Sequence, residues 1–378
     1  MMRTTTKLLF SLLLLPTICL AAAVAPTPTL EVKAYLLEDF NSGNQIAAYK
    51  NDDRVEPASL TKVMTAYVTF SAIKSGHLKL DQSVPVSEQA WKVEGSKMFI
   101  DPKVPVTVDE LLHGMIIQSG NDASITLAIA VAGSETQFAD MMNKQAAKLG
   151  MTSTHYMNAT GLPDKEHYTT ASDLAKLATA LIRDFPDEYK RLYSVKEYTY
   201  NKITQPNRNR LLWIDANVDG MKTGHTESAG YCLIASSKRG DTRLVSVILG
   251  AKSEAMRATE SQKLLNYGFQ FYESTLVYKR AQAINRLRVF KGQDDSIAAT
   301  VAKDLFLTLP KGDYARVKAS MTSQQPLVAP IKAGQAIGKI SFSLDGKVIG
   351  EQKLVAAKAV DEAGFFGRMI DSVKLMLQ

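Results

Sequence analysis

Residues 56–67 read EPASLTKVMTAY, and this stretch sets the start of a long helix and the position of a serine and a lysine. A proline and Ser59 are typical of a helix N-terminus, apolar residues recur at helical spacing after them, and Gly76 provides a stop. The pattern predicts a helix over residues 58–74. Lys62 does not fit a simple helix start, because a cation opposes the positive end of the helix dipole. One turn after Ser59 and on the same face, a lysine with a lowered pKa is suited to act as the base of a nucleophilic serine.

A second S-x-x-K match, at Ser71 and Lys74, shows how little four letters prove on their own. It lies at the C-terminal end of the same predicted helix, where a lysine complements the helix dipole. We therefore interpret Lys74 as ordinary helix chemistry.

The N-terminus has the composition of an export signal. Residues 1–23 contain two cations, an apolar run and a final A-x-A site, which predicts a cleaved secretory signal. A transmembrane anchor is the alternative, but the apolar run is short and Pro16 interrupts it. Cleavage removes Cys19 and leaves Cys232 as the single cysteine, so no internal disulfide is expected.

The rest of the chain has the composition of a globular protein: 378 residues in all, 46% apolar and 22% charged, enough for two or more domains. Of its 45 Lys and Arg residues, Arg3 and Lys7 fall in the predicted signal, which leaves 43 against 38 acidic residues and a net charge of +5. No basic stripe is interleaved with aromatic residues, so nucleic acid is not an expected partner. An anionic lipid surface or an anionic polymer outside the cytoplasm fits this charge better.

The order of predicted elements indicates an α+β fold. Residues 31–50 alternate apolar and polar residues around a turn and predict a strand hairpin. Residues 80–185 are mostly helical, and the helix at 123–132 is apolar on every side, as in a core. Strand patterns return in three later stretches, residues 196–203, 230–237 and 242–251. Residues 28–274 are therefore predicted to form an antiparallel sheet flanked by helices, with a helical insert.

The C-terminal part has a different sequence pattern. Residues 275–358 consist of short alternating runs between Gly, Pro and Asp-Gly turns, which predicts a small all-β domain. Residues 359–378 predict an amphipathic helix, which either docks on this domain or lies on a membrane surface. We favour the membrane anchor, because two adjacent Phe residues and flanking cations suit an interface. The segment carries too many charges to span a bilayer.

Two later stretches offer further groups for serine chemistry. IIQSGNDAS places Ser119 and Asn121 at a break between two apolar helices, where a loop presents a hydroxyl and an amide to a cleft. VDGMKTGHT places Lys222, Thr223 and Gly224 on or beside an edge strand, where glycine lets a substrate backbone approach. A serine nucleophile with a lysine base needs such groups to carry protons, orient the substrate and hold an oxyanion.

Three motifs therefore follow one another along the chain: Ser59-x-x-Lys62, Ser119-x-Asn121 and Lys222-Thr223-Gly224. Together they resemble the signature of the penicillin-binding protein and serine β-lactamase superfamily. The S-G-N and K-T-G-H-T forms are most similar to the low-molecular-mass D-alanyl-D-alanine carboxypeptidases, and the similarity covers most of the chain. Another S-G-N, at residues 42–44, is a decoy in a predicted hairpin turn. The resemblance implies a transpeptidase/β-lactamase-like catalytic domain.

The resemblance also implies a role for each catalytic residue. Ser59 attacks the carbonyl between two terminal D-alanines, and neutral Lys62 takes its proton. Ser119 relays a proton to the leaving amine, and Asn121 orients Lys62 and the acyl part. The backbone N–H groups of Ser59 and His225 hold the oxyanion.

Substrate binding is implied for the K-T-G stretch and for one arginine. Lys222 supplies positive charge near the substrate carboxylate, and Thr223 donates a hydrogen bond to it. Gly224 follows them on the same strand and belongs to the binding site. Arg257 resembles an arginine that related enzymes place near this carboxylate, and a solvated arginine is the alternative. Asp219 is either a partner of Lys222 or part of a turn.

The partners implied by the resemblance are peptidoglycan pentapeptides ending in D-Ala-D-Ala and β-lactam antibiotics as covalent inhibitors. The implied location is the periplasm, with the C-terminal helix on the outer face of the inner membrane. The five histidines form no metal-binding pair on a helix, so no metal and no cofactor is expected.

Three alternatives remain at this stage. A D,D-endopeptidase or transpeptidase shares the three motifs. A β-lactamase of the same fold is less favoured, because no E-x-x-L-N stretch follows Ser119. A non-catalytic wall-binding or shape-determining protein is disfavoured because all the chemical groups are present.

Overall fold

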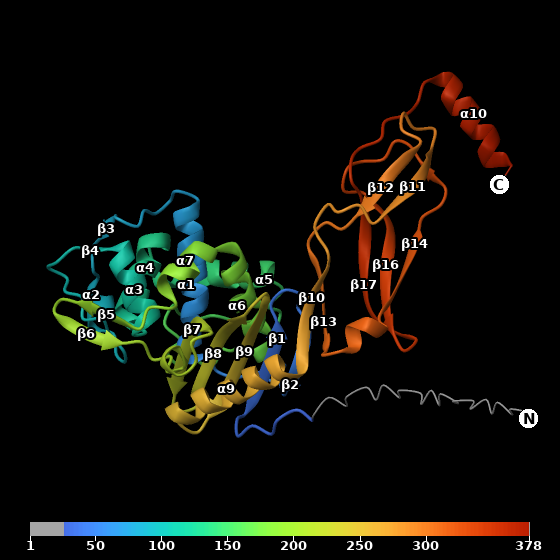
Figure 1. Cartoon of the computed structure of the whole chain (residues 1–378). Helices are drawn as coiled ribbons and strands as arrows, with labels where there is room; N and C mark the ends of the chain where they lie inside the picture. Colours follow the sequence, from blue (N-terminus) through green and yellow to red (C-terminus); the bar gives the residue numbers. More distant parts are fainter. Residues whose placement is uncertain (1–25, 378) are drawn as a thin grey trace, which may run out of the picture.

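The computed structural model describes residues 26–377, so the predicted signal at residues 1–23 lies outside the described residues. Figure 1 shows a mixed α/β body, an arm built of strands, and a short helix at the far end of that arm. The expected fold class is confirmed, because an antiparallel sheet with helices is followed by an all-β domain and a terminal helix. Within residues 26–377, no helix is long and apolar enough to cross a bilayer.

A five-stranded antiparallel sheet forms the centre of the body, in the order β2–β1–β9–β8–β7. Its strands are β1 Ala34–Asp39, β2 Gln45–Tyr49, β7 Val218–Thr226, β8 Gly230–Arg239 and β9 Thr242–Ala251. Successive residues of a strand face opposite sides of a sheet. On β1, Leu36 belongs to the apolar cluster shared with α6 (Ala171–Asp184), whereas Leu37 belongs to the cluster shared with α9 (Glu254–Phe271). Both faces of the sheet are therefore buried, and the hairpin predicted at residues 31–50 is present.

Four helices, α3, α4, α5 and α6, contact α1 (Thr61–Lys74), whereas α8 contacts β7. The body's helices other than α1, α6 and α9 are α2 Glu88–Lys92, α3 Val108–Ile117, α4 Asn121–Ala132, α5 Glu135–Lys148, α7 Pro186–Leu192 and α8 Leu211–Ile214. The short strands among them are β3 Ser83–Val84, β4 Val106–Thr107, β5 Glu197–Tyr200 and β6 Ile203–Pro206. As predicted, α4 is buried on nearly every side. The pattern at residues 196–203 folds as a hairpin of β5 and β6 instead of one strand, because two residues with positive φ, Asn201 and Lys202, make a tight turn there.

The all-β domain has a six-stranded sheet in the order β14–β16–β17–β12–β11–β15 and a two-stranded ribbon of β10 and β13. Its strands are β10 Tyr272–Tyr278, β11 Asn285–Phe290, β12 Ser296–Thr300, β13 Leu305–Pro310, β14 Lys318–Ser323, β15 Leu327–Val328, β16 Ala336–Leu344 and β17 Lys347–Ala356. Alternating residues of β16, such as Ile340 and Phe342, are buried in a core separate from those of the body. Asp345 and Gly346, both with positive φ, form the tight turn between β16 and β17.

The turn between β1 and β2 contacts the arm at the ribbon of β10 and β13 (Figure 1). The hydroxyls of Ser42 and Thr308 share a hydrogen bond of 2.7 Å, and Nδ2 of Asn44 donates to the Thr308 carbonyl at 3.3 Å. The decoy S-G-N at residues 42–44 therefore contributes to the contact between the domains.

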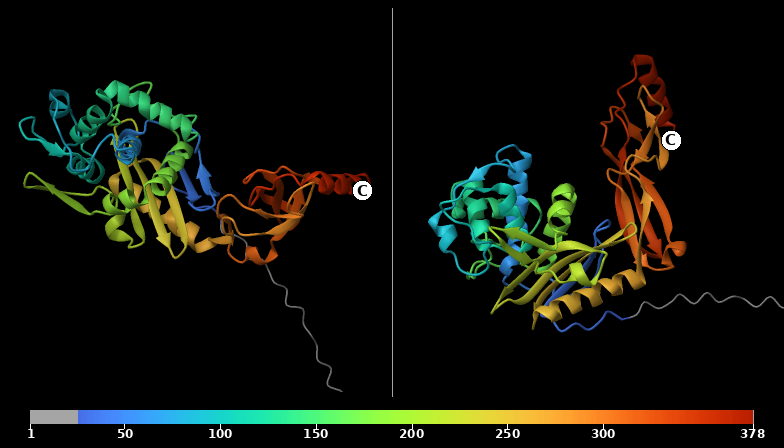
Figure 2. Two further views of the ribbon diagram at one scale, coloured as in Figure 1. Left: turned by 90° about the horizontal axis from the view of Figure 1, so that it is seen from above. Right: turned by 60° about the vertical axis from the view of Figure 1, so that its left-hand side comes forward.

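The terminal helix, α10 (Phe365–Met376), lies at the end of the arm farthest from the body in all views (Figures 1 and 2). Its large apolar side chains are exposed: Phe365, Phe366, Met369, Ile370, Val373 and Met376. The helix contacts the arm through a polar residue, because the backbone N–H of Lys291 donates to Asp371 at 2.7 Å. A helix docked by its apolar face on its own domain is thus not what the structure has.

Candidate active site

Ser59 lies in a short 3₁₀ turn, η1 (Ala58–Leu60), directly before α1. The preceding Ala58 has a φ of +47°, a left-handed value that residues with a Cβ atom rarely adopt. Surrounding contacts have to hold such a backbone in place. One of them is made by Gly161, where an added Cβ atom would come within 1.8 Å of the Ala58 carbonyl oxygen. The serine turn is therefore packed tightly against the loop that carries Gly161.

Lys62 follows one turn later, with its Nζ atom 2.9 Å from Oγ of Ser59. The lysine is buried, and Nζ also donates to Oδ1 of Asn121 at 2.7 Å and to the Thr160 carbonyl at 2.6 Å. Burial, and then the positive charge of Arg208, lower the pKa of Lys62 to about 7. In its neutral form the amine donates two N–H groups to Asn121 and Thr160, and its lone pair is left for the Ser59 hydroxyl. This arrangement suits a lysine that accepts the serine proton.

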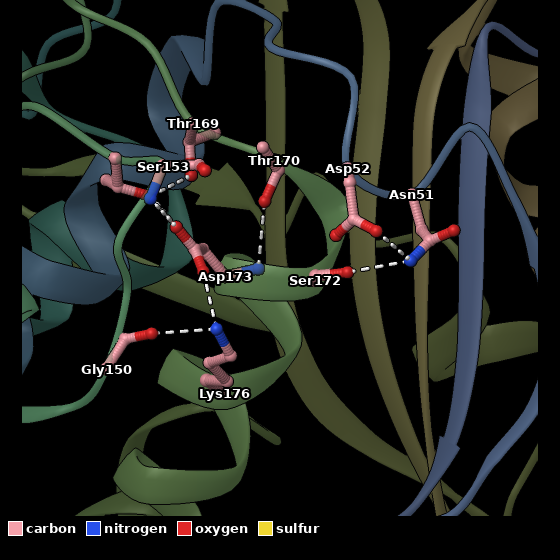
Figure 3. A network of polar contacts seen from close by, with 10 residues as sticks. Asn51, Asp52, Gly150, Ser153, Thr169, Thr170, Ser172, Asp173 and Lys176 are labelled. Atoms are coloured by element: carbon pink, nitrogen blue, oxygen red, sulfur yellow. Dashed lines mark hydrogen bonds and ion pairs between the residues drawn. The ribbon is translucent and has the colours of Figure 1, made fainter.

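The loop behind Lys62 is anchored by the polar network at the start of α6, shown in Figure 3. Thr170 caps this helix, because its hydroxyl accepts a hydrogen bond from the backbone N–H of Asp173 at 3.1 Å. The Asp173 carboxylate accepts a further bond from the N–H of Ser153 at 2.8 Å. The network ties together the two ends of the segment 153–170, whose middle supplies the carbonyl group bound by Lys62.

Ser119 and Asn121 occupy the break between α3 and α4, as the sequence predicts. Ser119 has a φ of +69°, and its hydroxyl is buried without a hydrogen-bond partner among residues 26–377. A buried hydroxyl without a partner is costly, so this group is well placed to bond a substrate. Each polar atom of the Asn121 amide makes one hydrogen bond: Oδ1 accepts from Lys62, and Nδ2 donates to the Glu94 carbonyl at 2.7 Å.

The K-T-G stretch lies on β7, which is the edge strand that the sequence predicts. Gly224 approaches the serine turn closely. An added Cβ atom would lie 3.2 Å from the backbone nitrogen of Ser59 and 3.1 Å from the carbonyl oxygen of Pro57. A larger residue would push the serine turn away from β7, so glycine keeps the nucleophile beside the strand edge.

Lys222 is buried on the same strand, and its Nζ donates to the Thr223 carbonyl at 3.1 Å. Burial, followed by the charge of Lys62, holds the pKa of Lys222 well below its usual value. The suggested pairing of Lys222 with Asp219 is wrong, because the Asp219 carboxylate pairs with Arg243 at 2.8 Å. The arginine competes successfully because it fits a carboxylate with two N–H groups.

Arg257 lies near the start of α9 and is 4% exposed, so it is not a solvated arginine. Its Nη1 donates to the Gly224 carbonyl at 3.4 Å and its Nη2 to the Arg208 carbonyl at 3.3 Å. The ring of His225 stacks on the ring of Tyr231, with 4.0 Å between the ring centroids. The Arg257 guanidinium lies 5.6 Å from the centre of the Tyr231 ring.

These groups converge on a cavity of about 390 Å³. It is lined by Ser59, Gly95, Ser96, Ser119, Arg208, Thr223, Gly224, His225 and Arg257. The other residues singled out from the sequence, Lys62, Asn121 and Lys222, are buried and contact this lining. Two arginines, Arg208 and Arg257, line the cavity, so it favours an anionic group on its ligand. Among residues 26–377, no group of His, Cys, Asp or Glu side chains is arranged to hold a metal ion.

Sequence reasoning missed Arg208 and Ser96. Ser96 lines the cavity from a loop that Asp122 holds in place. The Asp122 carboxylate accepts hydrogen bonds from the backbone N–H groups of Met98 at 3.0 Å and of Phe99 at 2.9 Å. Arg208 is fixed by its two buried neighbours, Asn207 and Asn209. The sequence Asn-Arg-Asn was the available signal, because asparagine side chains stabilise local turns by bonding the backbone.

The site therefore combines a serine hydroxyl, a buried lysine within hydrogen-bonding distance of it, a strand edge and a cavity lined by two arginines. Together with the fold, these features define a serine acyl-transfer enzyme of the penicillin-binding type.

Comparison with known proteins identifies the family. The profile described as D-alanyl-D-alanine carboxypeptidase matches residues 21–253, and the profile of the penicillin-binding protein 5 C-terminal domain matches residues 272–362. The chain is 44% identical over 374 residues to D-alanyl-D-alanine carboxypeptidase DacC of Escherichia coli K12, which covers 97% of this chain and 93% of that protein. The chain belongs to the D-alanyl-D-alanine carboxypeptidase family, and it is a serine carboxypeptidase.

Solved structures agree with this assignment. Penicillin-binding protein 5 from Haemophilus influenzae superposes with a TM-score of 0.86 at 41% identity, covering 90% of this chain and 100% of that one. Penicillin-binding protein D2 from Listeria monocytogenes, in its ampicillin-bound form, superposes with a TM-score of 0.60 at 31% identity, covering 65% of this chain and 100% of that one. The endopeptidase, β-lactamase and non-catalytic alternatives are not favoured by these relatives.

Proposed function

We propose that this chain removes the terminal D-alanine from peptidoglycan pentapeptides that end in D-Ala-D-Ala, through an acyl-enzyme ester on Ser59. The observation that carries the proposal is the contact of 2.9 Å between Nζ of Lys62 and Oγ of Ser59, together with the lowering of the Lys62 pKa to about 7. The names of the relatives support the reaction type.

The first half of the reaction forms the ester. Oγ of Ser59 attacks the carbonyl carbon between the two D-alanines while its proton passes to Lys62. The backbone N–H groups of Ser59 and His225 stabilise the negative charge on the carbonyl oxygen. The C–N bond then breaks, and Ser119 relays the proton from Lys62 to the departing nitrogen. D-alanine therefore leaves with a neutral amino group, which takes up one further proton from solvent and becomes an ammonium group.

The second half hydrolyses the ester. Water attacks the ester carbonyl and passes a proton to Lys62, which is neutral again after the first half. When the ester C–O bond breaks, this proton returns to Oγ of Ser59. The peptide leaves one residue shorter, with a new terminal carboxylate.

The cationic side of the cavity is proposed to recognise the terminal carboxylate. Thr223 donates a hydrogen bond to it and Arg257 supplies a charged partner, while Lys222 adds positive charge nearby. Gly224 keeps the strand edge close to Ser59, and Asn121 orients Lys62 and the acyl part of the substrate. Charge-assisted hydrogen bonds of this kind are about twice as strong as neutral ones.

β-Lactam antibiotics are proposed to acylate the same serine. The ring amide opens as Ser59 attacks, but the leaving nitrogen remains joined to the acyl group and continues to occupy the cavity. Water then has poor access to the ester, so release is slow and the drug inhibits the enzyme. The ampicillin-bound form of a relative supports this proposal.

Penicillin labelling tests the nucleophile. The protein is incubated with benzylpenicillin, digested, and analysed by mass spectrometry, alongside an assay for D-alanine released from a pentapeptide. We expect one adduct, on the peptide that contains Ser59, and release of one D-alanine per pentapeptide. An adduct on any other residue would overturn the assignment.

The location is proposed to be the periplasm, after export by the signal at residues 1–23, with α10 bound to the outer face of the inner membrane. The exposed apolar face of α10 supports an interfacial helix. Deleting residues 359–378 should move the protein from membrane to soluble fractions and leave D-alanine release within about twofold, because the cavity lies on the body. Unchanged partitioning would rule out the anchor.

A further inference from the structure

The net positive charge of the described residues is located in the arm. Residues 272–377, which form the arm and α10, carry 16 Lys and Arg residues against 10 Asp and Glu residues, a net charge of +6. Residues 26–271, which form the body, carry 27 against 28, a net charge of −1. A large anionic surface is therefore attracted by the arm and not by the body as a whole.

The terminal helix does not supply this charge. Residues 359–377 contain two cations, Arg368 and Lys374, against three acidic residues. Both cations are paired, Arg368 with Glu362 and Lys374 with Asp371. The exposed apolar face of α10 is suited to enter a bilayer, but a segment with a net charge of −1 gives no preference for anionic lipids. Such a preference has to come from the strands of the arm.

Two arginines on β11 are available for this role. Arg286 and Arg288 are exposed, and they share one face of the strand because alternate residues face the same side. Their neighbours across the ladder, Ala298 and Ser296, are small. Arg286 donates to the Ser296 hydroxyl at 3.4 Å, and the Arg288 guanidinium lies 4.6 Å from the centre of the Phe290 ring. Among residues 26–377, neither arginine forms an ion pair.

These arginines lie beside the terminal helix, because β11 contacts α10 (Figure 1). The backbone N–H of Lys291, directly after β11, donates to Asp371 of the helix. At 3.6 residues per turn, Met369 and Val373 lie on the opposite side of the helix from Asp371, and both are exposed. The helix therefore turns its apolar side away from the arm. When that side enters a bilayer, β11 lies within about one helix diameter, or 10 Å, of the acyl chains, and its arginine side chains can reach the lipid headgroups.

We propose that Arg286 and Arg288 bind the phosphate groups of anionic phospholipids, so that the arm recognises lipid charge while α10 supplies the apolar anchor. This inference rests on the proposed location of α10. The planar guanidinium group matches the oxygen atoms of a phosphate. The adjacent apolar helix favours a lipid over an anionic polymer of the cell wall, because a polymer would leave that face exposed to water. Stable attachment to a membrane commonly combines an apolar and a cationic contact of this kind.

Binding to two kinds of vesicle tests the proposal. Purified protein that retains residues 359–378 is mixed with vesicles of phosphatidylcholine alone, or of phosphatidylcholine with phosphatidylglycerol, and the bound fraction is measured by co-sedimentation. The measured quantity is the ratio of the two partition coefficients. One cation near an anionic surface strengthens binding about fivefold, so the two arginines should give a ratio of about 10 to 30 at low salt. High salt should abolish this ratio and leave the binding to phosphatidylcholine, because only the charged contact is screened.

Variants assign the preference to β11. The double change Arg286→Gln with Arg288→Gln should bring the ratio close to one and leave D-alanine release unchanged. Each single change should lower the ratio about three- to fivefold, and these variants test the proposal even if the double variant fails to fold. Replacing both arginines by lysine keeps the charges and should retain most of the ratio.

A matched control removes two cations from the opposite end of the same sheet. Lys318 and Lys347 are both exposed, and the strand register places them close to the turn between β16 and β17. This turn lies at the end of the sheet away from α10 (Figure 1). The double change Lys318→Gln with Lys347→Gln should leave the ratio within about twofold, because these charges lie more than a screening length from the membrane.

The possible failures are distinguishable. Equal binding of the parent protein to both kinds of vesicle overturns the recognition of lipid charge and leaves α10 as the anchor. Equal losses in the two double glutamine variants overturn the assignment to β11, because the attraction then belongs to the whole arm. If the arginine changes weaken binding to isolated cell-wall polymer and not to vesicles, the partner is a polymer and the lipid proposal is wrong. No binding of the parent protein to either vesicle overturns the proposed location itself.

Discussion

The two ends of α1 carry the same four-residue spacing in different surroundings. At the N-terminal end, Nζ of Lys62 is buried and lies 2.9 Å from Oγ of Ser59. At the C-terminal end, the hydroxyl of Ser71 donates to the carbonyl of Tyr67 at 2.8 Å, within its own helix. Lys74 is exposed there and donates to the carbonyl group of Asp184, at the end of α6, at 3.3 Å.

The difference shows that burial and hydrogen-bond partners distinguish the proposed catalytic pair from its counterpart, whereas the spacing of four residues is common to both. A serine in the middle of a helix satisfies its hydroxyl with a carbonyl one turn back, and an exposed ammonium group remains solvated. Ser59 lies before the helix, where no such carbonyl competes, and Lys62 is desolvated beside other cations. Each substitution at Ser59 or Lys62 can therefore be compared with the same substitution at Ser71 or Lys74, which serves as its control.

Ser59→Ala should have the largest effect. The variant lacks the nucleophile, so penicillin labelling should disappear and D-alanine release should fall about 1,000-fold or more. Ser71→Ala removes a hydroxyl that bonds only its own helix and should leave both activities within about twofold. Equal labelling of the two variants, measured by gel fluorescence with a fluorescent penicillin, would remove the basis of the comparison.

Lys62→Arg should come next. Arginine does not lose its proton in proteins, so it offers no lone pair to Ser59, and it does not fit a site built for an amine. We expect the second-order rate constant for acylation by penicillin to fall about 100- to 10,000-fold, which is the range for loss of a general base. Lys74→Arg keeps the charge on an exposed side chain and should retain the parent rate. An active Lys62→Arg enzyme would mean that another group accepts the serine proton.

Much of the fold follows from the sequence because local patterns reflect burial. The continuous buried runs in β8 and β9, the apolar circumference of α4 and the Thr107 cap of α3 each have a physical cause that acts within a few residues. The same holds for the three motifs, whose order along the chain allowed the family to be identified. The splitting of residues 196–203 into a hairpin was missed, because a tight turn at Asn201 and Lys202 interrupts an otherwise continuous strand pattern.

The contacts of the site are the part that the sequence could not supply. Thr160 and Gly161 lie about a hundred residues after Ser59, yet one accepts a hydrogen bond from Lys62 and the other packs on the serine turn. Neither has a motif, because a backbone carbonyl serves equally well from any residue. Arg208 was missed for a related reason: a charged residue in a loop is usually solvated, and only the folded chain shows that this one lines the cavity.

Arg257→Ala should have a smaller effect than either change at the catalytic pair. Loss of a charge-assisted hydrogen bond costs about 1.5 to 3 kcal/mol, which corresponds to about 10- to 100-fold in kcat/KM for a peptide with a free terminal carboxylate. A peptide amidated at its terminus should show almost no difference between variant and parent. Arg183→Ala, in the last turn of α6, removes an arginine that pairs with Asp184 and serves as the control. A similar loss for both peptides would indicate a structural role for Arg257.

The smallest effect, and the most specific, is a shift of the pH profile. Burial lowers the pKa of Lys62 to about 7, so below this pH the amine is protonated and has no lone pair for the Ser59 proton. The rate of acylation by penicillin should therefore rise about tenfold per pH unit up to about pH 7 and level off above it. The charge of Arg208 contributes to the lowering, so Arg208→Ala should raise the pKa of Lys62 and move the midpoint upwards. Arg210→Ala removes an exposed arginine two positions along the same loop and should not move the midpoint, because that charge is screened by solvent and pairs with Glu254. The Arg208→Ala midpoint has to move upwards, because a nearby positive charge lowers the pKa of the group that titrates. An unchanged or lower midpoint would mean that Arg208 does not act on that group.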